Sequence, residues 1–182
     1  MISTPSAPAV ASPTITLRAV EPTDADFMYE VENDPANRLY SDTIAPISRK
    51  IIRDYALSYD ADPFSARQLR LIISAPNPVG IVDLYEIDPV HRRAFIGIYI
   101  LPSCRHSGIA SKAIAALEDY CRDALRLRLL AARVESSNTS SVSLFKKCGF
   151  NEAARIPAWF ILPSGAASSL IIFTKFLINN PK

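Results

Sequence analysis

Apolar side chains recur along this chain in two spacings, and each spacing predicts a different kind of element. Recurrence every three to four residues predicts a helix with one apolar face, whereas alternation or a short apolar run predicts a strand. The helical spacing is found at 23–34, 48–59, 107–125 and 138–148, and the strand patterns at 14–19, 68–74, 79–86, 93–101, 129–135, 150–162 and 170–178. The order β-α-α-β-β-β-α-β-α-β-β predicts one mixed α/β domain.

Polar and turn-forming residues mark where several of these elements begin and end. Thr23, followed three residues later by Asp26, has the spacing of a capping box for the first helix. Asn138 or Ser140 is placed to cap the last helix, and Gly149 to end it in a left-handed conformation.

Length and composition are those of an ordinary globular protein. The chain has 182 residues, 49% of them hydrophobic and 21% charged, which fits a single domain over 14–182. Residues 1–13 are rich in Ser, Ala and Pro and predict a flexible tail. A net charge of +2 without a dense basic run argues against a nucleic-acid partner, and the apolar runs are too short to cross a membrane.

Cysteine and histidine are too few and too scattered for a metal site. The 3 cysteines lack CxxC spacing, and there are 2 histidines. This usage is typical of a protein in the reducing cytoplasm, without a disulfide framework.

The stretch Arg105-His106-Ser107-Gly108-Ile109-Ala110 lies where a buried strand passes into the longest predicted helix. The first turn of a helix leaves backbone N–H groups unpaired at the positive end of its dipole, and such groups bind phosphate oxygens. A plain strand-to-helix turn capped by Ser107 accounts for the same residues. By itself, the hexapeptide leaves a diphosphate site and a plain turn open.

With a second motif, the chain resembles the GNAT superfamily of acyl-CoA-dependent N-acetyltransferases. The hexapeptide is similar to the family's Q/R-x-x-G-x-G/A pyrophosphate loop, with Ala110 in the last position. The segment Asn138-Thr-Ser-Ser141-Val-Ser-Leu144-Phe145-Lys-Lys-Cys-Gly149-Phe150 is similar to the family's N-x-x-S-x-x-L-Y-x-x-x-G-F motif. Residues 86–98 resemble the branch of spermidine and ribosomal-protein N-terminal acetyltransferases.

The resemblance implies a GNAT-like fold in which strands 93–101 and 129–135 splay apart, and acetyl-CoA as cosubstrate. Backbone N–H groups of 105–110 would hold the pyrophosphate, and the end of the preceding strand would pair with the pantetheine arm. The implied cofactor-binding residues are Ile100, Leu101, Arg105, His106, Ser107, Gly108, Ile109, Ala110, Asn138, Ser141 and Phe145.

The implied reaction is direct attack of a primary amine on the acetyl thioester, which needs a proton acceptor and a proton donor. Phe145 stands where many family members have a Tyr acid, and Arg133 stands where some have a Glu base, five residues before Asn138. Glu135 and Glu86 are the candidate bases, and each is equally interpreted as a surface or amine-binding carboxylate.

The acceptor is expected to be a small amine or a peptide N-terminus. Tyr40 and Asp42 fall in the family's substrate-facing loop, and Trp159 is placed either to form the opposite wall or to be an aromatic of the core or of an interface. A polyamine calls for several carboxylates, and the chain has these near the first helix at Glu30, Glu32, Asp34 and Asp42.

Two other functions are compatible with the same residues. The departures at Phe145 and Arg133 allow a non-catalytic acyl-CoA-binding protein. Cys104 with His91 or His106 would be the pair for a thiol hydrolase, although no nucleophile-elbow motif accompanies it. A homodimer is left open.

Overall fold

The computed structural model describes residues 14–38, 45–58 and 62–178. The predicted tail at 1–13 lies outside these residues, and so do the candidate acceptor residues Tyr40 and Asp42. Within the described part, no helix combines the length and apolar composition that a membrane-spanning segment needs.

The elements follow the predicted order, with short additions. The strands are β1 (Thr16–Ala19), β2 (Gln68–Ser74), β3 (Pro78–Asp88), β4 (Arg93–Ile100), β5 (Leu129–Glu135), β6 (Asn151–Ile161) and β7 (Ala167–Phe176). The helices are α1 (Ala25–Asn33), α2 (Pro35–Arg38), α3 (Arg49–Leu57), α4 (Pro63–Ala66), α5 (Ile109–Asp123) and α6 (Thr139–Lys147), with 3-10 turns η1 (Pro22–Asp24) and η2 (Pro102–Cys104). The single turns α2 and α4 each begin at a proline and are too short to give a periodic signal.

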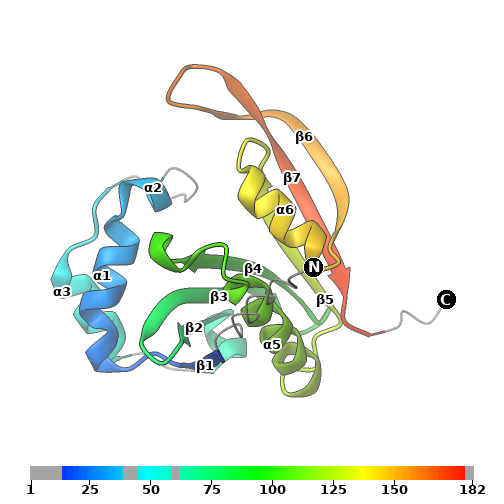
Figure 1. Ribbon diagram of the computed structural model, residues 1–182. Helices are drawn as coiled ribbons and strands as arrows, with labels where there is room; N and C mark the ends of the chain where they lie inside the picture. The colour runs from blue at the N-terminus through cyan, green and yellow to red at the C-terminus, as the bar shows by residue number, and fades with distance from the viewer. Residues whose placement is uncertain (1–13, 39–44, 59–61, 179–182) are drawn as a thin grey trace, which may run out of the picture.

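The strands form one sheet in the order β1-β2-β3-β4-β5-β7-β6 (Figure 1). Only β4 and β5 are parallel neighbours within the described sheet, and the other neighbours are antiparallel. Three residue pairs join β4 to β5, the last being Phe95 with Ala131, and β4 then continues to Ile100 without a described strand on that side. The two strands therefore separate, which confirms the expected mixed α/β fold with a splayed central pair.

Helices cover both faces of this sheet (Figure 1). The apolar side of α5, which includes Ile114 and Leu117, is buried against the central strands and β7. On the opposite face, Met28 of α1 and Ile52 of α3 pack over Ile72 of β2. The hairpin of β6 and β7 extends past α6, and its tip bends over toward the side where α2 lies. The separation of β4 and β5 thus lies between a face covered by α5 and a face covered by α1 and α3.

The first helix begins differently from the capping box predicted at Thr23 and Asp26. The N–H of Glu21 donates to the Asp24 carboxylate at 2.8 Å, and the helical turn starts at Pro22. Because proline favours the first helical position, the turn starts before Thr23. The prediction at Thr23 is wrong, and Glu21 and Asp24 are the reciprocal partners.

Asp24 is a buried carboxylate that ties this turn to β1. It is 3% exposed and accepts a hydrogen bond at 2.7 Å from each terminal nitrogen of Arg18. Burial works to raise the pKa of Asp24, but hydrogen bonds from Arg18 and Glu21 outweigh it, and the pKa lies below its ordinary value of 3.8. The ionised carboxylate therefore contributes stability that is present above the ordinary pKa and is lost as the pH falls through the lowered one.

Asp24→Asn should lower the free energy of unfolding by about 3 kcal/mol at pH 7, because it leaves Arg18 without its anion. The deficit should persist down to pH 3.8, where Asp24 of the unfolded chain begins to bind a proton, and should vanish as the pH falls through the lowered pKa of the folded protein. Urea unfolding at a series of pH values measures both effects. Asp26→Asn is the control, because Asp26 is exposed and pairs with Arg49 at the surface. An equal loss in the control would contradict the role given to Asp24.

Candidate active site

The loop between β4 and α5 presents a row of backbone N–H groups. Those of residues 106–111 donate no hydrogen bond to another described residue, and the helical ladder starts with the N–H of Lys112, which donates to Gly108. His106 and Gly108 have left-handed φ values of 61° and 82°, and such turns direct successive N–H groups toward one concavity. With the positive end of the α5 dipole behind it, the row suits a diphosphate.

Two residues of this loop act differently from the expectation. Ser107 does not cap α5, since its Oγ donates to a carbonyl within the loop at 2.6 Å and Gly108 takes the N-cap position. The N–H of Arg105 donates to a carbonyl of the preceding turn at 3.4 Å, and its Nε donates to the Ile100 carbonyl at 3.0 Å. The row therefore begins at His106, and Arg105 fastens the loop to the end of β4.

The open edge of β4 offers peptide groups at alternate residues. The N–H of Leu101 donates to Val79 at 2.9 Å and its carbonyl accepts from Cys104 at 2.8 Å, so both of its peptide groups are engaged. Alternation along the strand then directs the peptide groups of Ile98 and the N–H of Ile100 toward the space between the separated strands β4 and β5, which we call the gap. The sequence named Ile100 and missed Ile98, whose availability depends on where β4 and β5 separate.

Asn138 lies at the same end of the gap as the loop, because β4 and β5 run in parallel. Its Oδ1 accepts a hydrogen bond from the N–H of Ser141 at 3.1 Å, which confirms Asn138 rather than Ser140 as the cap of α6. The remaining polar atom of the side chain, Nδ2, is a hydrogen-bond donor.

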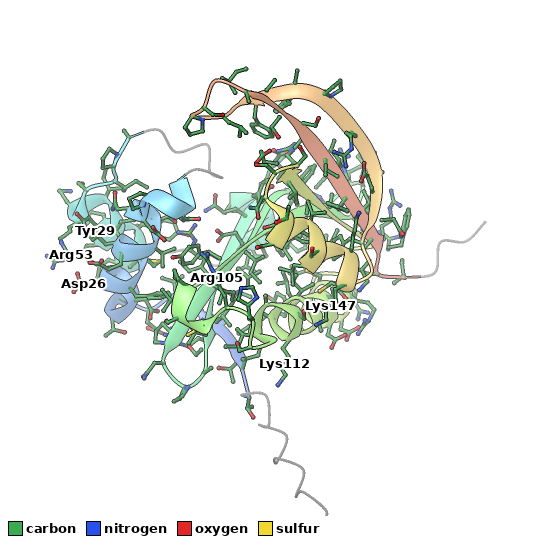
Figure 2. The ribbon with its side chains drawn as sticks, turned by 45° about the horizontal axis from the view of Figure 1, so that its top comes forward. Asp26, Tyr29, Arg53, Arg105, Lys112 and Lys147 are labelled. Carbon is green, nitrogen blue, oxygen red and sulfur yellow. The ribbon has the colours of Figure 1, made fainter. Side chains whose placement is uncertain are left out.

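Figure 2 shows Lys112 and Lys147 on the side of the molecule formed by α5 and α6, and Arg105 between that side and α1, which carries Asp26 and Tyr29. The guanidinium carbon of Arg105 lies 5.7 Å from the centre of the Tyr99 ring. Lys112 is near the start of α5, and a cation there complements the charge of a phosphate group.

Phe145 belongs to the core of α6. It is 3% exposed, and its ring lies 5.1 Å from that of Phe150 and 6.1 Å from that of Phe173. A ring buried in this way has little surface for a cofactor, and it carries no proton to donate.

Glu135, the last residue of β5, is a buried candidate base. It is 8% exposed, and its carboxylate accepts hydrogen bonds from the Ser137 N–H at 2.8 Å, the Ser137 hydroxyl at 2.5 Å and the Ser168 hydroxyl. Burial works to raise the pKa of Glu135, but these hydrogen bonds outweigh it and lower the pKa. This setting is poorly suited to accepting a proton from an ammonium group.

Glu86, the other candidate, is exposed in a bulge of β3 and has a φ of 50°. Its two oxygens accept hydrogen bonds from Arg133 at 2.6 and 2.9 Å, and the guanidinium carbon lies 3.9 Å from the centre of the Phe95 ring. The hydrogen bond from Arg133 lowers the pKa of Glu86. Because Phe95 is the last paired residue of β4, the ion pair of Glu86 with Arg133 lies where β4 and β5 begin to separate.

A pocket of about 330 Å³ opens between α1 and the end of β4. Its lining consists of Tyr29, Glu30, Val31, Asn33, Asp34, Pro35, Tyr99 and Leu101. The Tyr99 hydroxyl donates to Oδ2 of Asp34 at 2.8 Å. Burial and this hydrogen bond raise the pKa of Tyr99 to about 12, so the phenol stays a donor at neutral pH. Two carboxylates therefore line a pocket beside the open strand.

The other acceptor candidates are in different settings. Glu32 accepts a hydrogen bond from Arg70 at 2.6 Å, and the same guanidinium bonds Asp83, so Glu32 belongs to an ion cluster over the sheet. Trp159 of β6 is 57% exposed and is therefore not a core residue.

The cysteines give no support to a thiol hydrolase. Among the described residues, the hydrogen-bond partner of the Cys104 sulfur is Ser103, at 3.7 Å, and not a histidine. Burial raises the pKa of Cys121 to about 12 and also raises that of Cys148. In the described part of the chain, no three potential metal ligands stand together.

The chain is similar to known proteins in sequence and in structure. The protein-family model of the acetyltransferase (GNAT) domain matches residues 14–151. Spermidine N(1)-acetyltransferase of Vibrio cholerae is 28% identical over 156 residues, which cover 81% of this chain and 85% of that protein. The corresponding Escherichia coli protein is 26% identical over 138 residues, 75% of this chain and 73% of its own.

Solved structures show the same arrangement of elements. Spermidine N-acetyltransferase from Vibrio cholerae in complex with CoA and spermine has a TM-score of 0.79 at 25% identity, over 90% of this chain and 95% of that one. A dodecameric structure of spermidine N-acetyltransferase from Vibrio cholerae has a TM-score of 0.74 at 26% identity, over 90% and 94%. The family match spans more than half of the sequence, so the chain belongs to the GNAT family of acetyltransferases.

Proposed function

We propose that the protein transfers the acetyl group of acetyl-CoA to a primary amine of a polyamine. The observation that carries the proposal is the row of N–H groups at 106–111, placed at the end of an unpaired strand edge. The row would hold the pyrophosphate, and the peptide groups of Ile98 and Ile100 would pair with the pantetheine arm. Asn138 would donate to that arm, with Ser141 beside it.

Acetyl-CoA supplies a thioester whose carbonyl carbon the amine attacks, so that a C–N bond forms and the C–S bond breaks. Glu86, held ionised by Arg133, would orient the incoming ammonium where β4 and β5 separate. Its lowered pKa makes it a partner for the cation more than a strong base, so we assign the released proton to solvent. Since Phe145 has no proton to give, water would protonate the leaving thiolate.

The acceptor half of the proposal rests on the pocket beside β4. Glu30 and Asp34 line it, and carboxylates form the strongest hydrogen bonds to ammonium groups. The similar proteins are named spermidine N-acetyltransferases, which agrees with a polyamine in this pocket. Tyr40, Asp42 and Trp159 stay predictions for the rest of the acceptor site.

The cellular location and the oligomeric state are part of the same proposal. All three cysteines are free, as suits the reducing cytoplasm. One similar protein has a dodecameric structure, and we propose that this chain also self-associates, with a homodimer as the smallest unit.

Thermal unfolding with acetyl-CoA, acetate or ATP tests the cofactor half. A ligand at one hundred times its Kd adds about 2.7 kcal/mol of stability, so acetyl-CoA should raise the Tm by several degrees and acetate should leave it unchanged. CoA-thiol release is then followed with spermidine, spermine, a peptide N-terminus and an aminoglycoside, and the polyamines should react fastest.

Each result leads to a different conclusion. No shift with acetyl-CoA would refute the proposal as a whole. A shift without thiol release on any acceptor would leave the non-catalytic acyl-CoA-binding protein. Preference for the peptide would move the acceptor from polyamines to protein N-termini.

A further inference from the structure

The turn between β5 and α6 is fastened to β7 by hydrogen bonds of Ser136. Its N–H donates to the Ser169 carbonyl at 2.9 Å, and its Oγ accepts from the Ser169 N–H at 3.1 Å. The hydroxyls of Ser136 and Ser168 lie 2.8 Å apart. Backbone and side chain thus both hold the first residue of the turn against the neighbouring strand.

Glu135 lies at the centre of this network. Its carboxylate accepts bonds from the N–H and hydroxyl of Ser137 within the turn and from the hydroxyl of Ser168 on β7. Its backbone carbonyl accepts the N–H of Asn138 at 3.0 Å. One residue therefore holds the middle of the turn by its side chain and the end of the turn by its backbone.

The network is built for an acceptor without hydrogen atoms. Three donors converge on the carboxylate, and an ionised carboxylate has two oxygens that accept only. Glutamine has nearly the same shape but no charge, and its NH2 group only donates, so the Ser137 hydroxyl would have to turn and accept. In a site that is 8% exposed, charge-assisted hydrogen bonds are thus exchanged for weaker neutral ones.

The position of Asn138 depends on this turn. Its Oδ1 is committed to the N–H of Ser141, so the direction of Nδ2 follows from where the turn places the backbone. A shift of the turn moves Nδ2 along the gap even when the cap of α6 stays intact.

We infer that Glu135 is a positioning residue, which holds Asn138 at the cofactor gap through Ser137 and Ser168. This inference rests on the proposed function, because it takes Asn138 to bind the pantetheine arm. It assigns Glu135 to cofactor affinity and removes it from proton transfer.

A double-mutant cycle tests the inference, with the Kd of acetyl-CoA measured by calorimetry for Glu135→Gln, Asn138→Ala and both together. Glu135→Gln should raise the Kd about tenfold, since the hydrogen bonds that hold the turn lose their charge. Because Glu135 acts through Asn138, the double variant should bind little worse than Asn138→Ala alone. Glu152→Gln, a surface carboxylate on β6, is the matched control and should bind as wild type does.

Kinetics provide a readout that separates positioning from catalysis. In Glu135→Gln the KM for acetyl-CoA should rise, while the pH dependence of kcat keeps its wild-type shape. Ser168→Ala removes one of the three donors and leaves the charge, so it should raise the Kd in the same direction by a smaller factor. If Glu135→Gln does not fold, Ser168→Ala decides the question by itself.

The outcomes against the inference are distinct from failure of the proposed function. Wild-type protein that does not bind acetyl-CoA refutes the function. Wild-type binding with an unchanged Kd in the tested variant, Glu135→Gln or Ser168→Ala, refutes the positioning role alone. Additive losses in the cycle do the same. Loss of one limb of the pH profile in Glu135→Gln would make Glu135 the base.

Discussion

Replacing Gly108 by valine should weaken acetyl-CoA binding by about a hundredfold while the protein stays folded. Gly108 has a φ of 82°, and a Cβ placed on it meets no protein atom within 4 Å. That open space adjoins the N–H row at 106–111, so the valine methyls would stand between the row and a phosphate group. A hundredfold change corresponds to about 2.7 kcal/mol, in the range expected for losing charge-assisted hydrogen bonds. Calorimetric titration with acetyl-CoA measures the loss.

Gly165→Val is a closely matched control for this variant. Gly165 has a φ of 83° and also has no atom within 4 Å of a built Cβ, but it lies in the turn between β6 and β7. Both substitutions place a β-branched residue in the left-handed region, so both should lower the Tm by a similar amount. Only Gly108→Val should lose affinity. Equal affinities in the two variants would show that the diphosphate binds elsewhere.

Asp34→Asn should lower kcat/KM for spermidine by about thirtyfold, because it removes a negative charge from a half-buried pocket that we assign to a polycation. A hydrogen bond between charged groups contributes about 2 kcal/mol, which corresponds to that factor. Asparagine keeps an oxygen that can accept from the Tyr99 hydroxyl, so the wall of the pocket should stay in place. Initial rates with spermidine at saturating acetyl-CoA give the ratio.

Two further variants show whether the effect comes from charge in the pocket. Asp54→Asn removes an equal charge from the exposed side of α3, where Asp54 pairs with Lys50, and should leave kcat/KM unchanged. Tyr99→Phe keeps the ring and the Asp34 charge, so it should cost less than Asp34→Asn. An Asp34→Asn enzyme as active as wild type would place the polyamine outside this pocket.

The strand, loop and helix around residues 105–110 could be predicted because the information for them is local. These three elements are contiguous, and Gly108 sits where a left-handed residue must open α5. The exceptions are residues whose peptide groups are free or engaged depending on partners elsewhere in the chain. Leu101 differs from Ile98 because the Val79 carbonyl of β3 accepts its N–H and the Cys104 N–H donates to its carbonyl.

The acceptor side could not be predicted in the same way, because carboxylates look alike in sequence. Glu86 is paired with Arg133, 47 residues away, and Glu135 with Ser168, 33 residues away. Glu32 and Asp34 are two positions apart, yet one bonds Arg70 over the sheet and the other faces the pocket. Burial and long-range partners decide which carboxylates are available, and no local pattern encodes either.

The short junction of β4 and β5 divides the sheet into two halves joined by three residue pairs. Beyond Phe95, side-chain contacts such as the pair of Arg133 with Glu86 keep the halves together. A bound pantetheine arm would supply hydrogen bonds that a continuous sheet would make by itself. In each turnover these hydrogen bonds between β4 and the pantetheine arm would form and then break. CoA could leave no faster than they break, whatever the rate of acetyl transfer.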